Sequence, residues 1–280
     1  MSAGSEFEHG SVRIGLHFAA AMRALELAAE GLSRQEVAEQ LAPELAGEDE
    51  GRARRIAAVV ARRFVSHEPG AAPLQRLVAA MGPSLDTRHI LLYVLARQEP
   101  LVLSIASSVF YERFVLGRTP GGLSEREYAA VNTGRLIETD EVVTHRLVDH
   151  FANEQWGLED PASTQCVLRI LREGGAVGAT WTTRGSSRCL GYFPTHRGPS
   201  WRVFVYALWE QFASRGRRDV PRAHLRSMAL ARLFGMHGPV VDLLGDRAAA
   251  EGFGMIEHER SGGRLLVTHR TLDEAMAALI

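Results

Sequence analysis

The sequence predicts a mostly α-helical protein, in which an N-terminal helical bundle is followed by a helical domain with two β-hairpins in a winged-helix-like order. Three observations predict this fold class. Apolar residues recur at helical spacing through most of the 280 residues. Capping sequences and glycines divide this pattern into separate helices. Two stretches rich in β-branched and aromatic residues, each broken by a glycine-containing turn, are typical of β-hairpins.

Residues 1–160 are expected to form an all-helical domain. Ser33-Arg34-Gln35-Glu36 and Ser124-Glu125-Arg126-Glu127 are capping boxes, in which a serine and a glutamate satisfy free N–H groups at a helix start. Pro100 opens another helix, because proline suits the first helical turn. The expected helices are 11–30, 33–41, one across 52–64, 87–97, 101–116, one opened by Ser124, and 139–156, and a loop is expected at 67–73.

Residues 161–280 are expected to form a second domain, with Ser163 capping its first helix and Gly174-Gly175 ending it. After the first hairpin, three helices and a second hairpin follow in the order of a winged helix. In such a module one helix enters a groove of the nucleic acid and the hairpin, or wing, contacts phosphates. The expected elements are hairpin 176–183/188–193, helices 201–213, 221–234 and 239–251, hairpin 253–260/264–270 and a last helix from 271.

Composition predicts an ordinary globular protein of the cytoplasm. Hydrophobic residues make up 46% of the chain and charged residues 23%, and these fractions suit a packed core. Cys166 and Cys189 are too few for a disulfide framework or a thiolate zinc site, which favours a reducing compartment. Glu6 and Glu8 lie where a signal peptide would be basic. No apolar run approaches about 18 residues, so no membrane span is expected.

The arginines are strongly clustered along the chain. The net charge is −1, and all 32 basic residues are arginine, yet residues 161–232 hold twelve arginines against three acids. A local field of this kind predicts a polyanionic partner, of which nucleic acid is the commonest. The predicted third helix of the winged-helix-like module carries Arg247 among Asp242, Asp246 and Glu251, a poor composition for reading bases. We therefore expect the neighbouring elements to grip backbone phosphates, with weak sequence preference or none.

The candidate nucleic-acid-binding residues lie in four parts of the chain. These are the helix expected after Ser163, the first hairpin, the stretch from residue 215 into the expected helix 221–234, and the second hairpin. They are Arg169, Arg172, Arg184, Arg188, Arg215, Arg217, Arg218, Arg222, Arg226, Arg260 and Arg264.

Two alternatives stay open for these arginines. Residues 119–160 contain nine acids against three arginines, so the basic segment could pair with them inside the chain or across a dimer. The protein would then be an interaction scaffold whose basic segment docks on an acidic partner or a second copy. A further cluster forms either a second basic patch or the solvated face of an amphipathic helix, and comprises Arg52, Arg54, Arg55, Arg62 and Arg63.

Sequence signatures of catalysis are weak. The chain has no Walker A loop, no G-x-G-x-x-G after a strand, no H-E-x-x-H and no G-x-S-x-G. His145 and Asp149 share one helix face, with a spacing that suits a metal ion. This pair alone supports a metal-dependent nuclease, which is the weakest of the three hypotheses. We expect no catalytic residue, no metal site and no cofactor.

A series of apolar and aromatic residues runs through the middle of the chain: the runs 91–97, 110–114, 116–117 and 123–124, Tyr128, Trp156, and the runs 163–164 and 167–175. With these residues, the middle of the chain resembles the BrxA family of bacterial BREX phage-defence systems. The resemblance covers roughly residues 11–177. It implies a non-enzymatic, mostly helical DNA-binding accessory factor that works beside a methyltransferase, an ATPase and a phosphatase-like partner. Within the matching stretch, only Arg169 and Arg172 carry over as basic contacts.

Taken together, the sequence predicts a cytoplasmic DNA-binding protein of bacteriophage defence. Double-stranded DNA is the expected ligand and RNA the alternative. Other defence proteins and a second copy of the chain are the expected protein partners, and no membrane contact is expected.

Overall fold

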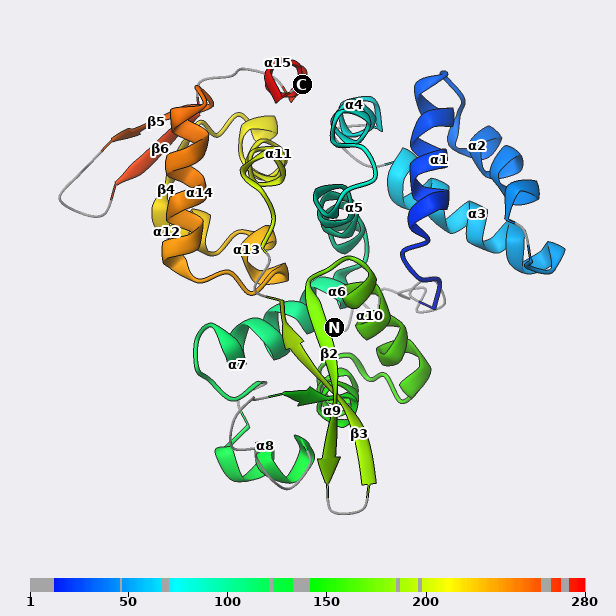
Figure 1. Ribbon diagram of the computed structural model, residues 1–280, viewed down its shortest axis with the longest axis vertical. Helices are drawn as coiled ribbons and strands as arrows, with labels where there is room; N and C mark the ends of the chain where they lie inside the picture. The colour runs from blue at the N-terminus through cyan, green and yellow to red at the C-terminus, as the bar shows by residue number, and fades with distance from the viewer. Residues whose placement is uncertain are drawn as a thin grey trace, which may run out of the picture.

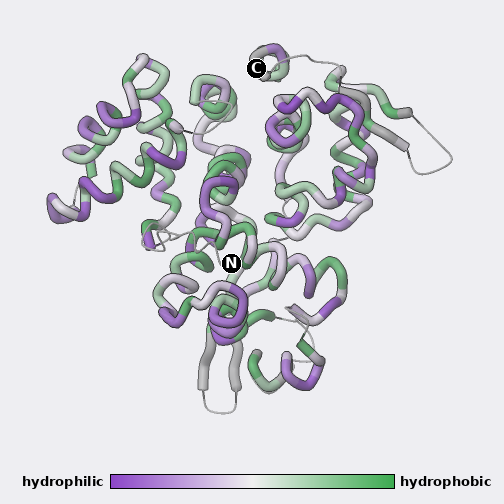
Figure 2. Tube along the Cα trace, turned by 180° about the vertical axis from the view of Figure 1, so that it is seen from behind, coloured by the Kyte–Doolittle hydropathy of each residue, from purple (hydrophilic) through white to green (hydrophobic). Residues whose placement is uncertain are grey.

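The structure, a computed structural model, describes residues 13–45, 47–66, 71–120, 123–132, 142–184, 187–195, 198–257, 263–267 and 272–279. It is mostly helical, with two small antiparallel sheets of three strands each, as the sequence predicts (Figure 1). The elements form three groups around a central helix, and hydrophilic and hydrophobic residues alternate along most helices (Figure 2).

The first group consists of four helices near the N-terminus. The predicted capping box at Ser33 is confirmed, since its hydroxyl accepts from the Glu36 N–H while Glu36 accepts from the Ser33 N–H at 2.7 Å. The expected helix 11–30 is shorter than predicted, because His17 adopts a left-handed φ of 46° just before it. The helices are α1 (Phe18–Ala29), α2 (Arg34–Leu41), α3 (Glu50–Val65) and α4 (Ala71–Met81), with a 3-10 turn at Ala42–Glu44.

The helix α4 corrects the loop expected at 67–73. Residues 67–70 lie outside the described residues, but helix begins at Ala71 and includes Pro73. Proline is tolerated in a first helical turn because the N–H that it lacks would have no partner there. Leu74, Leu77 and Val78 then form the buried face of the helix.

The central helix α5 (Leu85–Gln98) is buried on nearly all sides and contacts all three groups. Every residue from His89 to Ala96 is buried. The next helical stretch is continuous, as predicted, but contains a π-helical segment in its middle. Its parts are α6 (Pro100–Ile105), the π-helix η2 (Ala106–Tyr111) and α7 (Glu112–Phe114).

Two arginines of the N-terminal cluster are structural. The Arg63 side chain is fully buried and donates to Glu99 at 3.0 Å and to the carbonyls of Ile14 and Gly15 at 3.0 and 2.9 Å. Arg62 donates to the same Glu99 carboxylate at 2.7 Å. The two residues therefore fasten α3 to the start of α6 and hold the segment before α1, and they belong to neither reading considered for this cluster.

The second group surrounds the first sheet. Ser124 and Glu127 form the predicted capping box of α8 (Glu125–Asn132), with N–H donations of 2.8 Å and 3.3 Å. The expected helix 139–156 begins only at His145, because residues 143–144 form a strand. The elements that follow are β1 (Val143–Thr144), α9 (His145–Trp156), α10 (Pro161–Glu173), β2 (Val177–Arg184) and β3 (Ser187–Pro194), with strand order β1-β3-β2.

The third group repeats this topology. The expected helix 221–234 is divided into a strand and two short helices, because Met228 is extended. The predicted hairpin is present as β5 and β6, and residues 258–262 and 268–271 lie outside the described residues. The elements are α11 (Trp201–Gln211), a 3-10 turn at Ala213–Arg215, β4 (Asp219–Pro221), α12 (Arg222–Arg226), α13 (Ala229–Leu233), α14 (Gly238–Ala250), β5 (Gly254–Glu257) and β6 (Arg264–Val267), with strand order β4-β6-β5.

The second and third groups each contain a helix, a short strand, further helices and a hairpin whose second strand lies in the middle of the sheet. This is the topology of a winged helix. We call them the first unit, 125–194, and the second unit, 201–267. The third-helix position is held by α10 in the first unit and by α14 in the second.

The predicted boundary at 160/161 falls inside the first unit. It separates β1 and α9 from α10, although β1 pairs with β3 through Val143–Tyr192 and Thr144–Gly191. The C-terminal helix α15 (Leu272–Leu279) packs against α11 and against α4 of the first group, so the end of the chain contacts a helix far from it in sequence (Figure 1).

No single helix in the described part of the chain has the length and apolarity to cross a membrane. The pair Leu85–Gln98 and Pro100–Phe114 passes that test only when its two helices are combined, and they are bent by 108°.

Candidate nucleic-acid interface

The helix α10 has an apolar face that packs into the core and an exposed basic face. Val167, Leu168 and Ile170 are buried, whereas Arg169 and Arg172 are exposed. The guanidinium of Arg169 lies 3.9 Å from Glu173, a distance at the outer limit of an ion pair. Two candidate arginines are thus brought to the accessible side of the third helix of the first unit.

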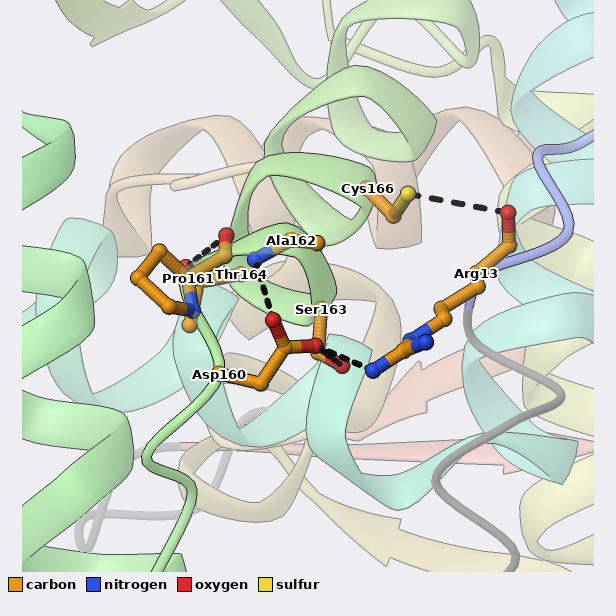
Figure 3. A network of polar contacts seen from close by, with 7 residues as sticks. All are labelled: Arg13, Asp160, Pro161, Ala162, Ser163, Thr164 and Cys166. Carbon is orange, nitrogen blue, oxygen red and sulfur yellow. Dashed lines mark hydrogen bonds and ion pairs between the residues drawn. The ribbon is translucent and has the colours of Figure 1, made fainter.

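The start of α10 differs from the prediction. Asp160, rather than Ser163, is the N-cap, and its carboxylate accepts from the Ala162 N–H at 3.1 Å and from the Ser163 hydroxyl at 3.0 Å (Figure 3). Arg13 donates to the same carboxylate at 2.6 Å. The hydrogen bond from Ala162, with smaller contributions from Ser163 and Arg13, lowers the pKa of Asp160. The segment before α1 is therefore fastened to the start of α10.

The wing of the first unit carries two more candidates. Arg184 and Arg188 lie at the end of the β2–β3 ladder, where Thr183 pairs with Arg188 and Arg184 pairs with Ser187. Their side chains lie outside the described residues. Trp181 on β2 is 65% exposed, which is unusual for so large an aromatic residue. A ring of this kind is suited to stacking or to apolar contact with a partner.

A cleft of about 620 Å³ lies between α10 and the first group of helices. Its cations come from the segment before α1, from α3, from α5 and from α10, elements that are far apart in sequence. Two acids, Glu48 and Glu173, also line it, and Arg52 pairs with Glu48 at 2.9 Å. We call it the α10 cleft, and its arginines are Arg13, Arg52, Arg55, Arg88 and Arg169.

The sequence indicated some members of this cleft and missed others. Arg52 and Arg55 were in the N-terminal cluster, and Arg169 was a candidate, but nothing local connected them. Arg13 and Arg88 were not considered, since each is a single arginine in a helical or N-terminal stretch. Arg88 lies over the Phe18 ring, 5.4 Å from its centroid, and this contact orients it beside the cleft.

The second unit has a different electrostatic arrangement. Arg222 donates to Asp246 at 2.7 Å and lies 3.7 Å from Asp242, and Arg226 donates to both carboxylate oxygens of Asp242. The acids of α14 thus neutralise the two candidate arginines of α12. These pairs are intramolecular, as one alternative expected, but their acids lie on α14 and not in residues 119–160.

The remaining candidates of this unit are spread over its surface. Arg215, Arg217 and Arg218 are exposed in the turn between α11 and β4. Arg264 is in β6 with its side chain outside the described residues, as is the whole of Arg260. The candidates whose side chains are described are thus divided between the two units: Arg169 and Arg172 lie in the first, and Arg215, Arg217, Arg218, Arg222 and Arg226 lie in the second.

Of the pair His145 and Asp149, which was considered for a metal, Asp149 has a structural role. Asp149 accepts a hydrogen bond from the Thr164 hydroxyl and so joins α9 to α10. Within the described residues, no group of three or more His, Cys, Asp or Glu side chains could hold a metal ion.

Comparisons with protein-family models, with curated proteins and with solved structures give no match to this chain.

Proposed function

We propose that the protein binds double-stranded DNA in the cytoplasm through its first unit, by gripping backbone phosphates with arginine and without catalysing a reaction. The observation that carries the proposal is the position of Arg169 and Arg172. Both are exposed on α10, the third helix of a winged-helix topology. This is the helix that such modules direct toward the groove of a duplex.

The surroundings of α10 support the same proposal. The α10 cleft adds Arg13, Arg52, Arg55 and Arg88 on one side of the helix. The wing adds Arg184 and Arg188 at its far end. Arginine offers a planar fork of donors that matches phosphate geometry. The expected contacts are therefore to the backbone, with little discrimination between sequences.

A gel-shift titration tests this function. We expect the wild-type chain to shift a labelled duplex of random sequence at low salt, and the double variant Arg169→Ala/Arg172→Ala to bind it much more weakly. Arg34→Ala, on the exposed face of α2 and outside the α10 cleft, is the matched control and should bind like the wild type. Absence of binding to any DNA or RNA at low salt would overturn the proposal.

RNA is tested in the same assay by competition. Unlabelled duplex RNA of the same sequence should displace the DNA less effectively than unlabelled duplex DNA. Its deep and narrow major groove does not admit a helix. Equal displacement by the RNA and the DNA competitors would show that the interface binds the phosphate backbone of either nucleic acid.

One observation favours an interaction role for the second unit. Leu243 and Val240 are 67% and 45% exposed, and they lie on α14, the helix whose acids pair with the arginines of α12. We propose that this face contacts a second copy of the chain. Light scattering coupled to size exclusion tests it: Leu243→Asp should lower the mass of the wild-type species, and a wild type that is already monomeric at high concentration would contradict it.

We further propose, on the resemblance to BrxA alone, an accessory role beside other phage-defence proteins. Deleting the gene from a strain that restricts a phage should abolish restriction, and the Arg169→Ala/Arg172→Ala gene should fail to restore it. Unchanged restriction after deletion would contradict this role.

A further inference from the structure

A second cleft, of about 630 Å³, lies where α6 and η2 meet the second unit. It is separate from the α10 cleft, and its lining contains arginines, one histidine and serines but no carboxylate among the described residues. We call it the serine–arginine cleft. Its polar lining residues are Arg97, Arg215, Arg217, Arg232, His224, Ser104, Ser107, Ser108, Ser227 and Gln211.

Three of these arginines have no carboxylate partner among the described residues. Arg97 is neutralised by the buried Glu210, to which it donates at 3.2 and 3.3 Å. No ion pair with a carboxylate is found for Arg215, Arg217 or Arg232 within the described part of the chain. The α10 cleft differs, because Glu48 and Glu173 pair with its arginines. Cations gathered without counter-charges attract an anion.

Arg217 is held in one orientation by neutral groups. It donates to the Asp219 carbonyl at 3.3 Å, lies 2.7 Å from Nδ1 of His224, and lies over the Phe212 ring, 5.7 Å from its centroid. A fork of donors that is already fixed loses less conformational entropy when an anion binds. The arrangement therefore favours a ligand with several oxygens, such as a phosphate.

The π-helix η2 contributes Ser107 and Ser108 to the lining of the cleft. Their hydroxyl groups make no hydrogen bond to other described residues, whereas Ser104 accepts from the Trp156 indole at 3.1 Å. A π-helical turn is rare and often occurs at functional sites. Here it contributes two hydroxyl donors to the same cleft as the arginines.

The lining also has an apolar part. Phe212, Leu103 and Met228 provide surface for a flat, weakly polar group beside the cationic end. The volume lies in the usual range of small-molecule sites, about 300–1,000 Å³. A ligand with a phosphate at one end and a heteroaromatic ring at the other matches both parts.

We propose that the serine–arginine cleft binds a nucleotide, with its phosphate on Arg215, Arg217 and Arg232 and its base against Phe212. The nucleotide is supplied either free or as the phosphorylated end of a nucleic-acid strand. This proposal does not rest on DNA binding by the first unit, because it uses different residues in another part of the molecule.

Calorimetric titration of the full chain tests it, with ADP, inorganic pyrophosphate and adenosine as probes. We expect ADP and pyrophosphate to bind and adenosine not to bind. Arg215→Ala/Arg232→Ala should weaken ADP binding by about tenfold or more, because two charged hydrogen-bond donors are lost. Both residues are exposed, so the variant should keep the wild-type melting temperature. Arg34→Ala is the matched control.

Competition by short single strands identifies the source. If a 5′-phosphorylated strand displaces ADP and its 5′-hydroxyl counterpart does not, the cleft binds strand ends. If neither strand displaces ADP, the cleft binds free nucleotides. Failure of ADP and pyrophosphate to bind, or unchanged ADP binding by the double variant, overturns the proposal. Duplex binding that depends on Arg169 and Arg172 would be unaffected by that failure.

Discussion

Arg226 donates two hydrogen bonds to the carboxylate of Asp242, one of them 3.1 Å long from Nε to Oδ1. The pair joins α12 to α14 across the second unit. It bears on the role of the arginines before α14, because the carboxylate neutralises the charge of the guanidinium and so weakens its attraction for a phosphate. The basic segment is therefore divided between arginines that fasten the fold and arginines that are free to bind.

Removing the acids of α14 should release the arginines of α12. We expect Asp242→Asn/Asp246→Asn to raise affinity for duplex DNA about tenfold at low salt, because two negative charges disappear and two guanidinium groups become available. The cost in stability should be small, about 1 kcal/mol, since these pairs are partly exposed. Fluorescence anisotropy and urea unfolding measure the two effects. Unchanged affinity would show that this face lies away from the DNA.

The buried Glu210 should be essential for the junction between α5 and α11. It accepts from the Tyr93 hydroxyl and from Arg97, and it is 6% exposed. Burial and the nearby Glu210 raise the pKa of Tyr93, so the phenol stays a donor. Glu210→Ala should lower the free energy of unfolding by about 3 kcal/mol, because it leaves a charge and a hydroxyl without their partner.

Chemical denaturation checks this prediction, with Tyr93→Phe and Glu210→Gln as graded variants. Tyr93→Phe removes one hydrogen bond and should cost about 1–2 kcal/mol. Glu210→Gln keeps an acceptor for Tyr93, so its loss in the free energy of unfolding should lie between the losses of the other two variants. Equal destabilisation by all three variants would contradict the role of the carboxylate charge.

The buried Arg63 should control the segment before α1. Arg63→Met removes the donors to Ile14, Gly15 and Glu99, and should destabilise the fold by about 3 kcal/mol or more. Because the carbonyls of that segment lose their anchor, trypsin should also cleave after Arg13 faster. Arg54→Met removes an exposed arginine on the same helix, and it should neither destabilise the fold nor speed cleavage after Arg13. Wild-type resistance at Arg13 in the Arg63 variant would contradict the anchoring role.

His89 should make stability depend on pH in the acidic range. Its ring is buried against Phe234 at 4.7 Å between centroids, both ring nitrogens lack a hydrogen-bond partner, and burial lowers its pKa to about 4. The unfolded chain, with a histidine pKa near 6.5, binds the proton first. Stability is therefore complete above about pH 6.5 and falls as the pH drops toward 4, by about 2 kcal/mol at pH 5.

Urea unfolding at pH 7.5 and at pH 5 measures this loss. The His89→Leu variant cannot take up the proton. Between pH 7.5 and pH 5 its free energy of unfolding should therefore fall by about 2 kcal/mol less than that of the wild type. His237→Leu, which removes an exposed histidine, is the matched control. A wild type and an His89 variant with the same pH dependence would contradict the prediction.

Local signals in the sequence were enough to predict the elements that carry them. The capping boxes at Ser33 and Ser124 and both hairpins are present as predicted. The strands β1 and β4 were missed, because two or three residues show no alternation. β1 forms only because it can pair with the open edge of β3, and β4 only because it can pair with the open edge of β6. Without β1, the first unit could not be recognised as a winged-helix topology.

The partners of the arginines could not be predicted, because nothing local selects them. Arg63 meets Glu99 and Arg226 meets Asp242 only after the helices have packed. Counting charges along the chain offered residues 119–160 as one alternative set of partners, whereas the structure shows pairs of Arg222 and Arg226 with Asp242 and Asp246 on α14. The α10 cleft was hidden for the same reason, since Arg13 and Arg88 approach α10 from other elements.

The salt dependence of duplex binding tests the role of α10 most directly. Each phosphate contact made by an arginine adds about 0.9 to the slope of log K against log salt concentration. Anisotropy titrations over a series of salt concentrations should give a slope smaller by about two for Arg169→Ala/Arg172→Ala than for the wild type, with Arg34→Ala equal to the wild type. A double variant with the wild-type slope and affinity would contradict DNA binding through α10.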